Sequence, residues 1–191
     1  MSELNRMIAQ YAVFETRVQR YIRNYFWPYC STCADACCKP DFCQETLESI
    51  FLTFLREAYP PPASYSQENG WVSETGCILK IGRPPVCYEY LCDEIMAAQP
   101  TATYQYAVNV LSKLISHVGK RAHRGKHLVE ILDRKEIAVV KFSYFENRLK
   151  EAETAFASVV SFHKNDNLST LNWRDLEKIL FSPKAVKMRI K

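Results

Sequence analysis

The stretch Thr101–Val118, TATYQYAVNVLSKLISHV, decides the fold class. Its apolar residues recur three and four positions apart, which places them on one face of an α-helix. Thr101 or Thr103 is suited to cap this helix, because a threonine hydroxyl accepts hydrogen bonds from the first backbone N–H groups. The sequence therefore predicts a long amphipathic helix whose apolar positions are Tyr104, Ala107, Val108, Leu111, Leu114, Ile115 and Val118.

The rest of the C-terminal region has the same helical character. No proline occurs between Pro100 and Pro183, which favours long helices because proline disrupts a helix interior. Gly119 and Gly125 bracket a break, and a helical stretch is then expected over residues 126–162. The charged patch 133–136 either splits that stretch or forms a solvated face. A terminal helix over 173–181, capped by Asn172, and a frayed basic tail from residue 182 complete the prediction.

A further amphipathic helix is expected over residues 1–27. Its apolar residues alternate at spacings of three and four, and Pro28 is expected to end the helix. This stripe either faces the core of one subunit or forms the seam of a homodimer or of a contact with another protein. The residues of the stripe are Leu4, Met7, Tyr11, Phe14, Val18, Tyr21 and Tyr25.

The composition excludes several classes of protein. A chain of 191 residues with 48% hydrophobic residues is long and apolar enough to bury a core. The five glycines form no GxGxxG, GxxxxGK[ST] or GxSxG motif, so Rossmann, P-loop and hydrolase interpretations have no motif behind them. The formal net charge of +4 requires no polyanionic partner, so nucleic acid is disfavoured.

The sequence favours a cytoplasmic protein. Its first residues contain no apolar stretch of the length found in signal peptides. The longest aliphatic run, 137–140, is far short of the roughly 20 residues that a membrane span needs. We therefore expect no membrane association. Clustered cysteines in a reducing compartment more often bind metal or perform redox chemistry than form structural disulfides.

The eight cysteines divide the chain into three parts. Residues 1–27 and 96–191 contain none, so all of them fall in a loop-rich module over residues 28–95. We expect the three parts to form one compact, mainly α domain: a helical bundle with an irregular cysteine metal-binding module. The cysteines are Cys30, Cys33, Cys37, Cys38, Cys43, Cys77, Cys87 and Cys92.

The spacing within the module predicts a metal site built from two segments. A Cys-x-x-Cys pair such as Cys30 and Cys33 directs two thiolates at one ion, and tetrahedral sites usually take a second contribution from elsewhere in the chain. Asp41 and Gln44 have the spacing of a capping box. The helix that they would start, ending before Pro60, places Cys43 where the helix dipole favours a thiolate.

The second segment is expected to deliver the remaining thiols. A short strand is expected over residues 78–81, and Pro84 and Pro85 stiffen the turn that leads to Cys87. Arg83 either offsets the negative charge of the thiolates or pairs with a surface acid.

The module resembles a known family. Cys30-x-x-Cys33 followed by the Cys37-Cys38 pair, then Cys77 and the segment 83–92, RPPVCYEYLC, is similar to the YkgJ-like CxxCxxCC cysteine-cluster family. That family is regarded as a zinc- or iron-chelating domain, and the flagellin lysine methylase, related through this region, is associated with an iron–sulfur cluster. The resemblance covers about residues 28–95. It implies Cys30, Cys33, Cys37, Cys38, Cys77, Cys87 and Cys92 as ligands; Cys43 is added from its position.

The spacing departs from the family name in one respect. Three residues rather than two precede the double cysteine, so which of Cys37 and Cys38 binds the metal stays open. Thiolate ligands suit zinc or an iron–sulfur cluster and not magnesium or calcium. We expect a non-catalytic zinc protein with a structural or accessory role. An iron–sulfur redox or accessory protein, part of a protein-modifying enzyme, and a helical adaptor with a metal-stapled core are the alternatives.

A second, weaker pattern lies in a basic turn. His123 and His127 are four residues apart, the spacing at which two histidines on one helix share an ion. Gly125 lies between them and no acidic residue is adjacent, so a solvated basic turn is the preferred interpretation.

Overall fold

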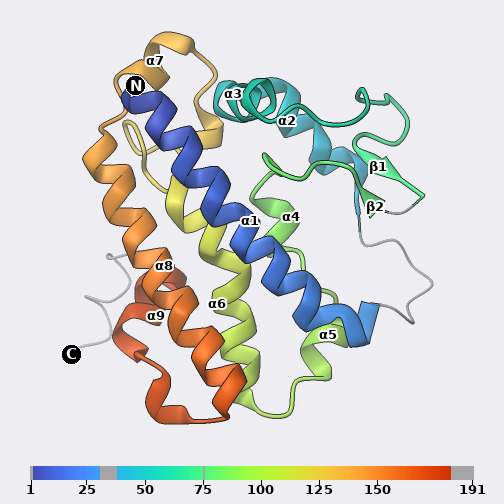
Figure 1. Ribbon diagram of the computed structural model, residues 1–191, viewed down its shortest axis with the longest axis vertical. Helices are drawn as coiled ribbons and strands as arrows, with labels where there is room; N and C mark the ends of the chain where they lie inside the picture. The colour runs from blue at the N-terminus through green and yellow to red at the C-terminus, as the bar shows by residue number, and fades with distance from the viewer. Residues whose placement is uncertain (1, 31–37, 75, 182–191) are drawn as a thin grey trace.

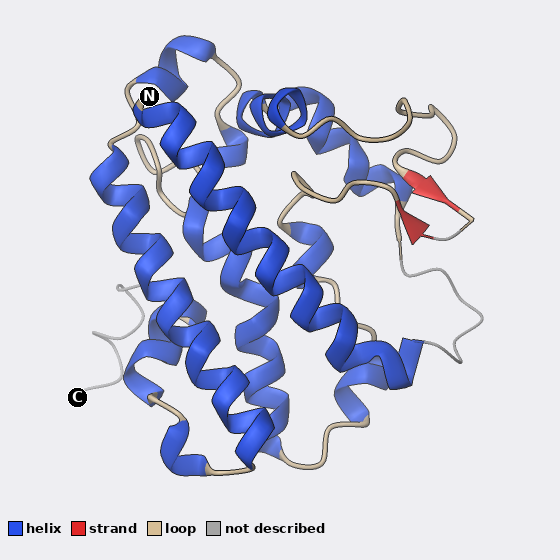
Figure 2. Ribbon diagram, viewed as in Figure 1, coloured by secondary structure: helices blue, strands red, loops and turns tan. Residues whose placement is uncertain are grey.

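The computed structural model describes residues 2–30, 38–74 and 76–181. This part of the chain is mainly helical, with one small antiparallel hairpin (Figure 2). The α-helices are α1 (Glu3–Cys30), α2 (Glu45–Glu48), α3 (Ile50–Ala58), α4 (Val86–Glu89), α5 (Asp93–Ala97), α6 (Ala102–Gly119), α7 (Arg134–Ala138), α8 (Phe142–Asn165) and α9 (Trp173–Leu180). The 3-10 helices are η1 (Pro40–Gln44), η2 (Leu128–Glu130) and η3 (Leu168–Thr170), and the strands are β1 (Val72–Ser73) and β2 (Gly76–Cys77).

The three long helices α1, α6 and α8 form the body of the molecule. All three run along its long axis, α6 in the direction opposite to α1 and α8, and each contacts the other two (Figure 1). Leu111, Leu114 and Ile115 of α6 have no exposed surface, and burying each such side chain contributes roughly 2 kcal/mol. The prediction of a helical bundle is confirmed, and the cysteine region lies to one side of α1 (Figure 1).

The apolar stripe of α1 faces the core of its own chain. Met7, Tyr11, Phe14 and Val18 are each at most 2% exposed and belong to the same hydrophobic core as α6 and α8. Of the two alternatives for the stripe, the structure therefore has the intramolecular one, and a partner helix would have to use another face of α1.

The prediction that Pro28 ends α1 is wrong. The helix continues through this proline to Cys30. Proline at this position removes the N–H that would bond to the carbonyl of Asn24. Asn24 is exposed, so water can bond to that carbonyl instead, and the loss falls on the last turn only.

The caps of the C-terminal helices agree with the sequence in part. The Thr101 hydroxyl accepts a hydrogen bond from the Tyr104 N–H, so the predicted cap of α6 is confirmed. Asp133 accepts from the Lys135 N–H at 2.7 Å and begins α7, so the stretch 126–162 is split at its charged patch into η2, α7 and α8. Asn172 precedes α9, but its side chain donates to Asp175 and does not cap the helix.

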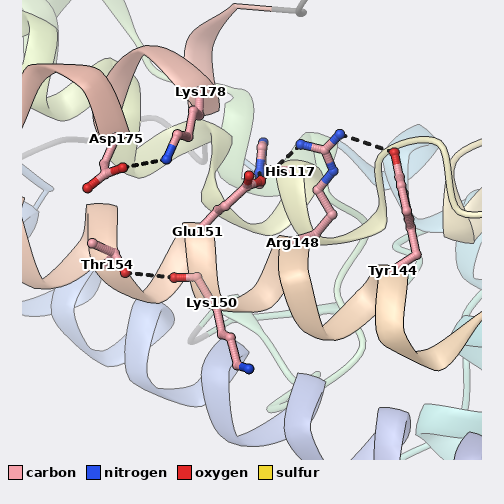
Figure 3. A network of polar contacts seen from close by, with 8 residues as sticks. All are labelled: His117, Tyr144, Arg148, Lys150, Glu151, Thr154, Asp175 and Lys178. Atoms are coloured by element: carbon pink, nitrogen blue, oxygen red, sulfur yellow. Dashed lines mark hydrogen bonds and ion pairs between the residues drawn. The ribbon is translucent and has the colours of Figure 1, made fainter.

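A polar network joins α6 to α8 (Figure 3). Nε2 of His117, which is 1% exposed, lies 2.8 Å from Oε2 of Glu151. Arg148 donates to the same oxygen at 2.9 Å and to the Tyr144 hydroxyl at 3.1 Å. Burial lowers the pKa of His117, so the ring is neutral and its Nε2–H donates to the carboxylate. The network provides hydrogen-bond partners for the ion pair between Arg148 and Glu151 at the edge of the core.

Candidate metal centre

The segment around Cys43 differs from the predicted capped helix. Cys43 lies inside η1, which leads into the single turn of α2, and the longer helix α3 begins only after Ser49. The Ser49 hydroxyl accepts from the Leu52 N–H at 3.3 Å and is the true cap. Gln44 donates to Glu48 instead of closing a capping box with Asp41. The prediction of a long helix that starts beside Cys43 is therefore wrong, although Cys43 is buried.

A hairpin brings Cys77 next to Cys43. β1 and β2 pair antiparallel with Val72 opposite Cys77, so the strand ends at Cys77 and the strand expected over residues 78–81 is not formed. Trp71, which precedes β1, donates from Nε1 to the Thr46 hydroxyl at 2.7 Å. Trp71, Leu79 and Cys43 form a small buried cluster, so the hairpin packs against η1.

The loop 82–88 delivers Cys87. Pro84 and Pro85 form the turn before α4, and Cys87 lies within that short helix, which the sequence did not predict. The loop is held to α1 by Glu15, whose carboxylate accepts hydrogen bonds from the N–H groups of Gly82 and Arg83. Because these hydrogen bonds fix the backbone at residues 82 and 83, Cys87 has a defined position relative to the hairpin.

Four of the predicted cysteines line one pocket. Cys38, Cys43, Cys77 and Cys87 surround a cavity of about 100 Å³. Cys43 is buried, Cys77 is half-buried, and Cys38 and Cys87 are exposed, so the thiols extend from the core to the surface. Phe42, Val72, Tyr90, Lys39 and Arg83 supply the rest of the wall.

The pocket keeps two of its thiols protonated. Burial is the main cause that raises the pKa of Cys77. The pKa of Cys87 is raised to about 12, chiefly by desolvation and then by repulsion from Cys77 and Cys43. Cys87 is exposed as a residue, but the apolar pocket wall accounts for the direction of its shift.

Arg83 opposes the rise of both thiol pKa values. Its positive charge favours the thiolate at Cys77 and at Cys87. Its Nε donates to the Leu79 carbonyl at 2.8 Å and its Nη2 to the Cys77 carbonyl at 3.3 Å. The guanidinium is thus bound to backbone carbonyls, and both sequence-based interpretations of Arg83, compensation of thiolate charge or pairing with a surface acid, stay predictions.

Of the described cysteines, Cys30 and Cys92 do not line the pocket. Cys30 ends α1 and is exposed. Cys92 precedes α5 and packs against a separate apolar cluster that contains Phe26 and Ile95. Cys33 and Cys37 lie outside the described residues.

The described side chains are not arranged as a finished metal site. Across residues 2–30, 38–74 and 76–181, no three His, Cys, Asp or Glu side chains are placed so that they could hold one ion. The pocket thus brings four thiols together without the close approach that coordination requires.

The two histidines of the basic turn do not form a paired site. Nε2 of His127 lies 2.7 Å from the Ser116 carbonyl, and its Nδ1 accepts from the Val129 N–H at 3.2 Å. Both ring nitrogens are therefore used within the fold. A Cβ on Gly119 would come within 2.3 Å of this ring, so glycine is required there by close approach. Sequence reasoning missed this role of His127 as the cap of η2.

The comparisons with known proteins found no match. The chain matches no protein-family model, no curated protein and no solved structure. Among the described helices, none has the length and apolar character that crossing a bilayer requires.

Proposed function

We propose that this chain is a metal-binding protein in which thiolates of the cysteine module hold a zinc ion with a structural or accessory role. The observation that carries the proposal is that Cys38, Cys43, Cys77 and Cys87 reach one pocket from three separate segments of the chain. Four thiolates complete the tetrahedral coordination of a structural zinc site. We further propose that the protein acts in the cytoplasm, where such thiols stay reduced.

The chemistry of the donor set fits zinc better than a hard cation. All four groups are sulfur ligands, which select zinc, copper(I) or iron–sulfur clusters over magnesium and calcium. A bound zinc would supply the positive charge that stabilises the thiolates. The protein would position the ligands and balance their charge. The packing of η1 against the hairpin holds Cys43 and Cys77 together, and Arg83 offsets part of the remaining negative charge.

Binding would have to draw the thiols inward. The described side chains are not yet spaced for coordination, and zinc–sulfur bonds are about 2.3 Å long. Ligand sites that form only as the metal binds couple the binding free energy to folding. On this proposal the metal fastens η1, the hairpin and α4 to one another, and thereby the module to α1.

A second candidate is an iron–sulfur redox or accessory protein. The exposure of Cys38 and Cys87 favours it, because a cluster at the surface can exchange electrons with a partner. The same exposure would suit a cluster that serves a protein-modifying enzyme. A helical adaptor with a metal-stapled core remains the third proposal.

Metal analysis of protein purified without oxygen tests these proposals. We expect a colourless protein that contains about one zinc per chain. A brown protein with iron, sulfide and charge-transfer absorption would replace zinc by the iron–sulfur alternative. A folded protein that contains no metal and takes up neither zinc nor cobalt(II) on addition would overturn both.

A further inference from the structure

Glu15 is a carboxyl side chain inside the core, and burial raises its pKa against the hydrogen bonds that favour the ionised form. It lies on the buried face of α1, between Phe14 and Val18 in the stripe, and has no exposed surface. A carboxylate in such a place is costly unless hydrogen bonds compensate for the lost water. A helix that needed only to pack on α6 and α8 would be served better by an apolar residue. The position therefore calls for an explanation.

Among the described residues, the carboxylate accepts its hydrogen bonds from the segment 82–88, which carries Cys87. The Gly82 N–H donates to Oε2 at 2.8 Å, and the Arg83 N–H donates to Oε1 at 3.0 Å. The Tyr88 hydroxyl donates to Oε1 at 2.8 Å, and Gln19 in turn donates to that hydroxyl at 3.3 Å. Three donors aimed at one carboxyl group suit its ionised form, which only accepts hydrogen bonds.

The three donors bracket Cys87 and include the backbone of Arg83. Gly82 and Arg83 stand before the two prolines, and Tyr88 directly follows Cys87. The guanidinium of Arg83 then reaches the carbonyls of Leu79 and Cys77. One carboxylate on α1 thus fixes both ends of the turn that presents Cys87, together with the residue that binds the backbone of Cys77.

We propose that Glu15 is the positioning residue of the thiol site: by holding Arg83 and Tyr88 it keeps Cys87 at the pocket that Cys77 also lines, so that a metal can draw the two thiols together. The inference rests on the proposed function, since it assigns a role within that metal site. Glu15 does not bind the metal itself. Glu15 lies on α1, so its hydrogen bonds also hold α1 against the segment 82–88. Metal binding and this packing of α1 therefore stabilise one another.

Cobalt(II) binding to the reduced, metal-free full chain tests the inference. Cobalt(II) serves as the probe because its absorption reports a tetrahedral thiolate environment. The variant Glu15→Gln keeps the shape of the side chain but replaces one acceptor oxygen by an NH₂ donor, which then opposes the loop's own donors. We expect it to bind cobalt(II) about 10- to 100-fold more weakly, which is the usual effect of losing a group that orients a metal ligand.

The matched control is Glu153→Gln. Glu153 makes an exposed ion pair with Arg17 at 3.0 Å, so this variant makes the same chemical change from acid to amide without touching the segment 82–88. It should bind cobalt(II) as the unaltered protein does. Circular dichroism of the metal-free proteins establishes that each variant is folded before binding is compared.

A second variant covers the case in which Glu15→Gln does not fold. Tyr88→Phe removes one donor and leaves the carboxylate with its two backbone partners. We expect a smaller loss, about 10-fold, together with an altered cobalt(II) spectrum. Folded Glu15→Gln or Tyr88→Phe protein with unchanged affinity and spectrum would overturn the inference and leave the metal site standing. An unaltered protein that binds no cobalt(II) would instead remove the proposed function.

Discussion

Gly70 lies against Cys43: a Cβ atom on Gly70 would come within 2.8 Å of the Cys43 sulfur. Gly70 also has a φ of +60°, in the left-handed region that other residues rarely adopt. Its N–H and carbonyl both pair with Ser66, so the backbone at this point is fixed. The loop before β1 can approach η1 this closely only because position 70 has no side chain.

The first prediction concerns this contact. Gly70→Ala should lower the free energy of unfolding by about 2 to 4 kcal/mol, because it combines the strain of a positive φ with overpacking against a buried residue. Because the added methyl group displaces Cys43, metal binding should weaken as well. Chemical denaturation and cobalt(II) titration of the same preparation measure the two effects.

Gly76→Ala is the control for Gly70→Ala. Gly76 also has a positive φ, +102°, but no atom lies within 4 Å of the place where its Cβ would be. This variant carries the backbone strain without the clash, so it should cost about 1 kcal/mol. Equal losses for the two variants would show that the contact with Cys43 is unimportant.

A second prediction separates the cysteines of the pocket from the others. Cys87→Ser should abolish stoichiometric metal binding, because serine is a poor ligand for a thiophilic metal. Cys92→Ser is the matched control: Cys92 is five residues further on and packs against Phe26 and Ile95, away from the pocket. Metal content per chain, measured after purification without oxygen, should fall in the first variant and stay unchanged in the second.

If Cys92→Ser lost the metal as Cys87→Ser does, the ligand set would be the one implied by the family resemblance, which contains both cysteines, and not the pocket, which contains Cys87 alone of the two. Thermal unfolding of both variants without metal guards against a general loss of structure. If a variant is less stable than the unaltered protein only when metal is present, the lost stability comes from metal binding at the site.

Most of the helical framework could be predicted from the sequence. The stripe of α1 and the Thr101 cap of α6 follow from local spacing and capping chemistry, which act within a few residues. The wrong predictions concern positions where contacts with the rest of the fold outweigh the local preference of one residue. Pro28 is tolerated because the orphaned carbonyl is at the surface, and the helix after Cys43 is interrupted because Ser49 caps α3 while Ile50 bonds to the Ile131 carbonyl.

The candidate site was predictable only in its residue types. The clustering of cysteines indicated thiol chemistry, and the structure brings Cys38 of the first group to Cys77 and Cys87 of the second. Cys92 has the same local signal as Cys87 yet lies elsewhere, because its neighbours pack on the end of α1. The role of Glu15 could not be predicted from the sequence, because a single acidic residue in a helix is normally taken to be exposed to solvent.

A third prediction follows from the raised thiol pKa values. Cys77 and Cys87 are protonated at neutral pH, so a metal must displace their protons when it binds. Affinity should therefore rise with pH by about 10-fold per unit for each proton displaced, so these two thiols alone contribute about 100-fold per unit to the slope. Competition with a chelator of known pH dependence, between about pH 6 and about pH 8, measures the slope. An affinity that does not change with pH would mean that the ligands are already thiolates.

The last prediction concerns His163 and acid stability. The ring stacks on Tyr25 at 4.2 Å and lies 2.9 Å from the Tyr21 hydroxyl. Desolvation lowers its pKa to about 4, below the unfolded value of about 6.5. The unfolded chain therefore takes up a proton first as the pH falls, so the stability from this group is complete above about pH 6.5 and is lost towards about pH 4.

The test compares His163→Phe with the unaltered protein. Phenylalanine keeps the stacked ring but cannot be protonated, so between about pH 7 and about pH 5 the variant should lose about 1 kcal/mol less unfolding free energy, a figure discounted for the water that reaches this half-buried ring. His123→Gln, in the partly exposed turn, is the comparison variant, because it removes a histidine without touching the stacked ring. Denaturant unfolding at both pH values gives the comparison. Parallel curves for His163→Phe and the unaltered protein would assign the acid sensitivity to the buried His117 and His127, whose pKa values are also lowered by burial.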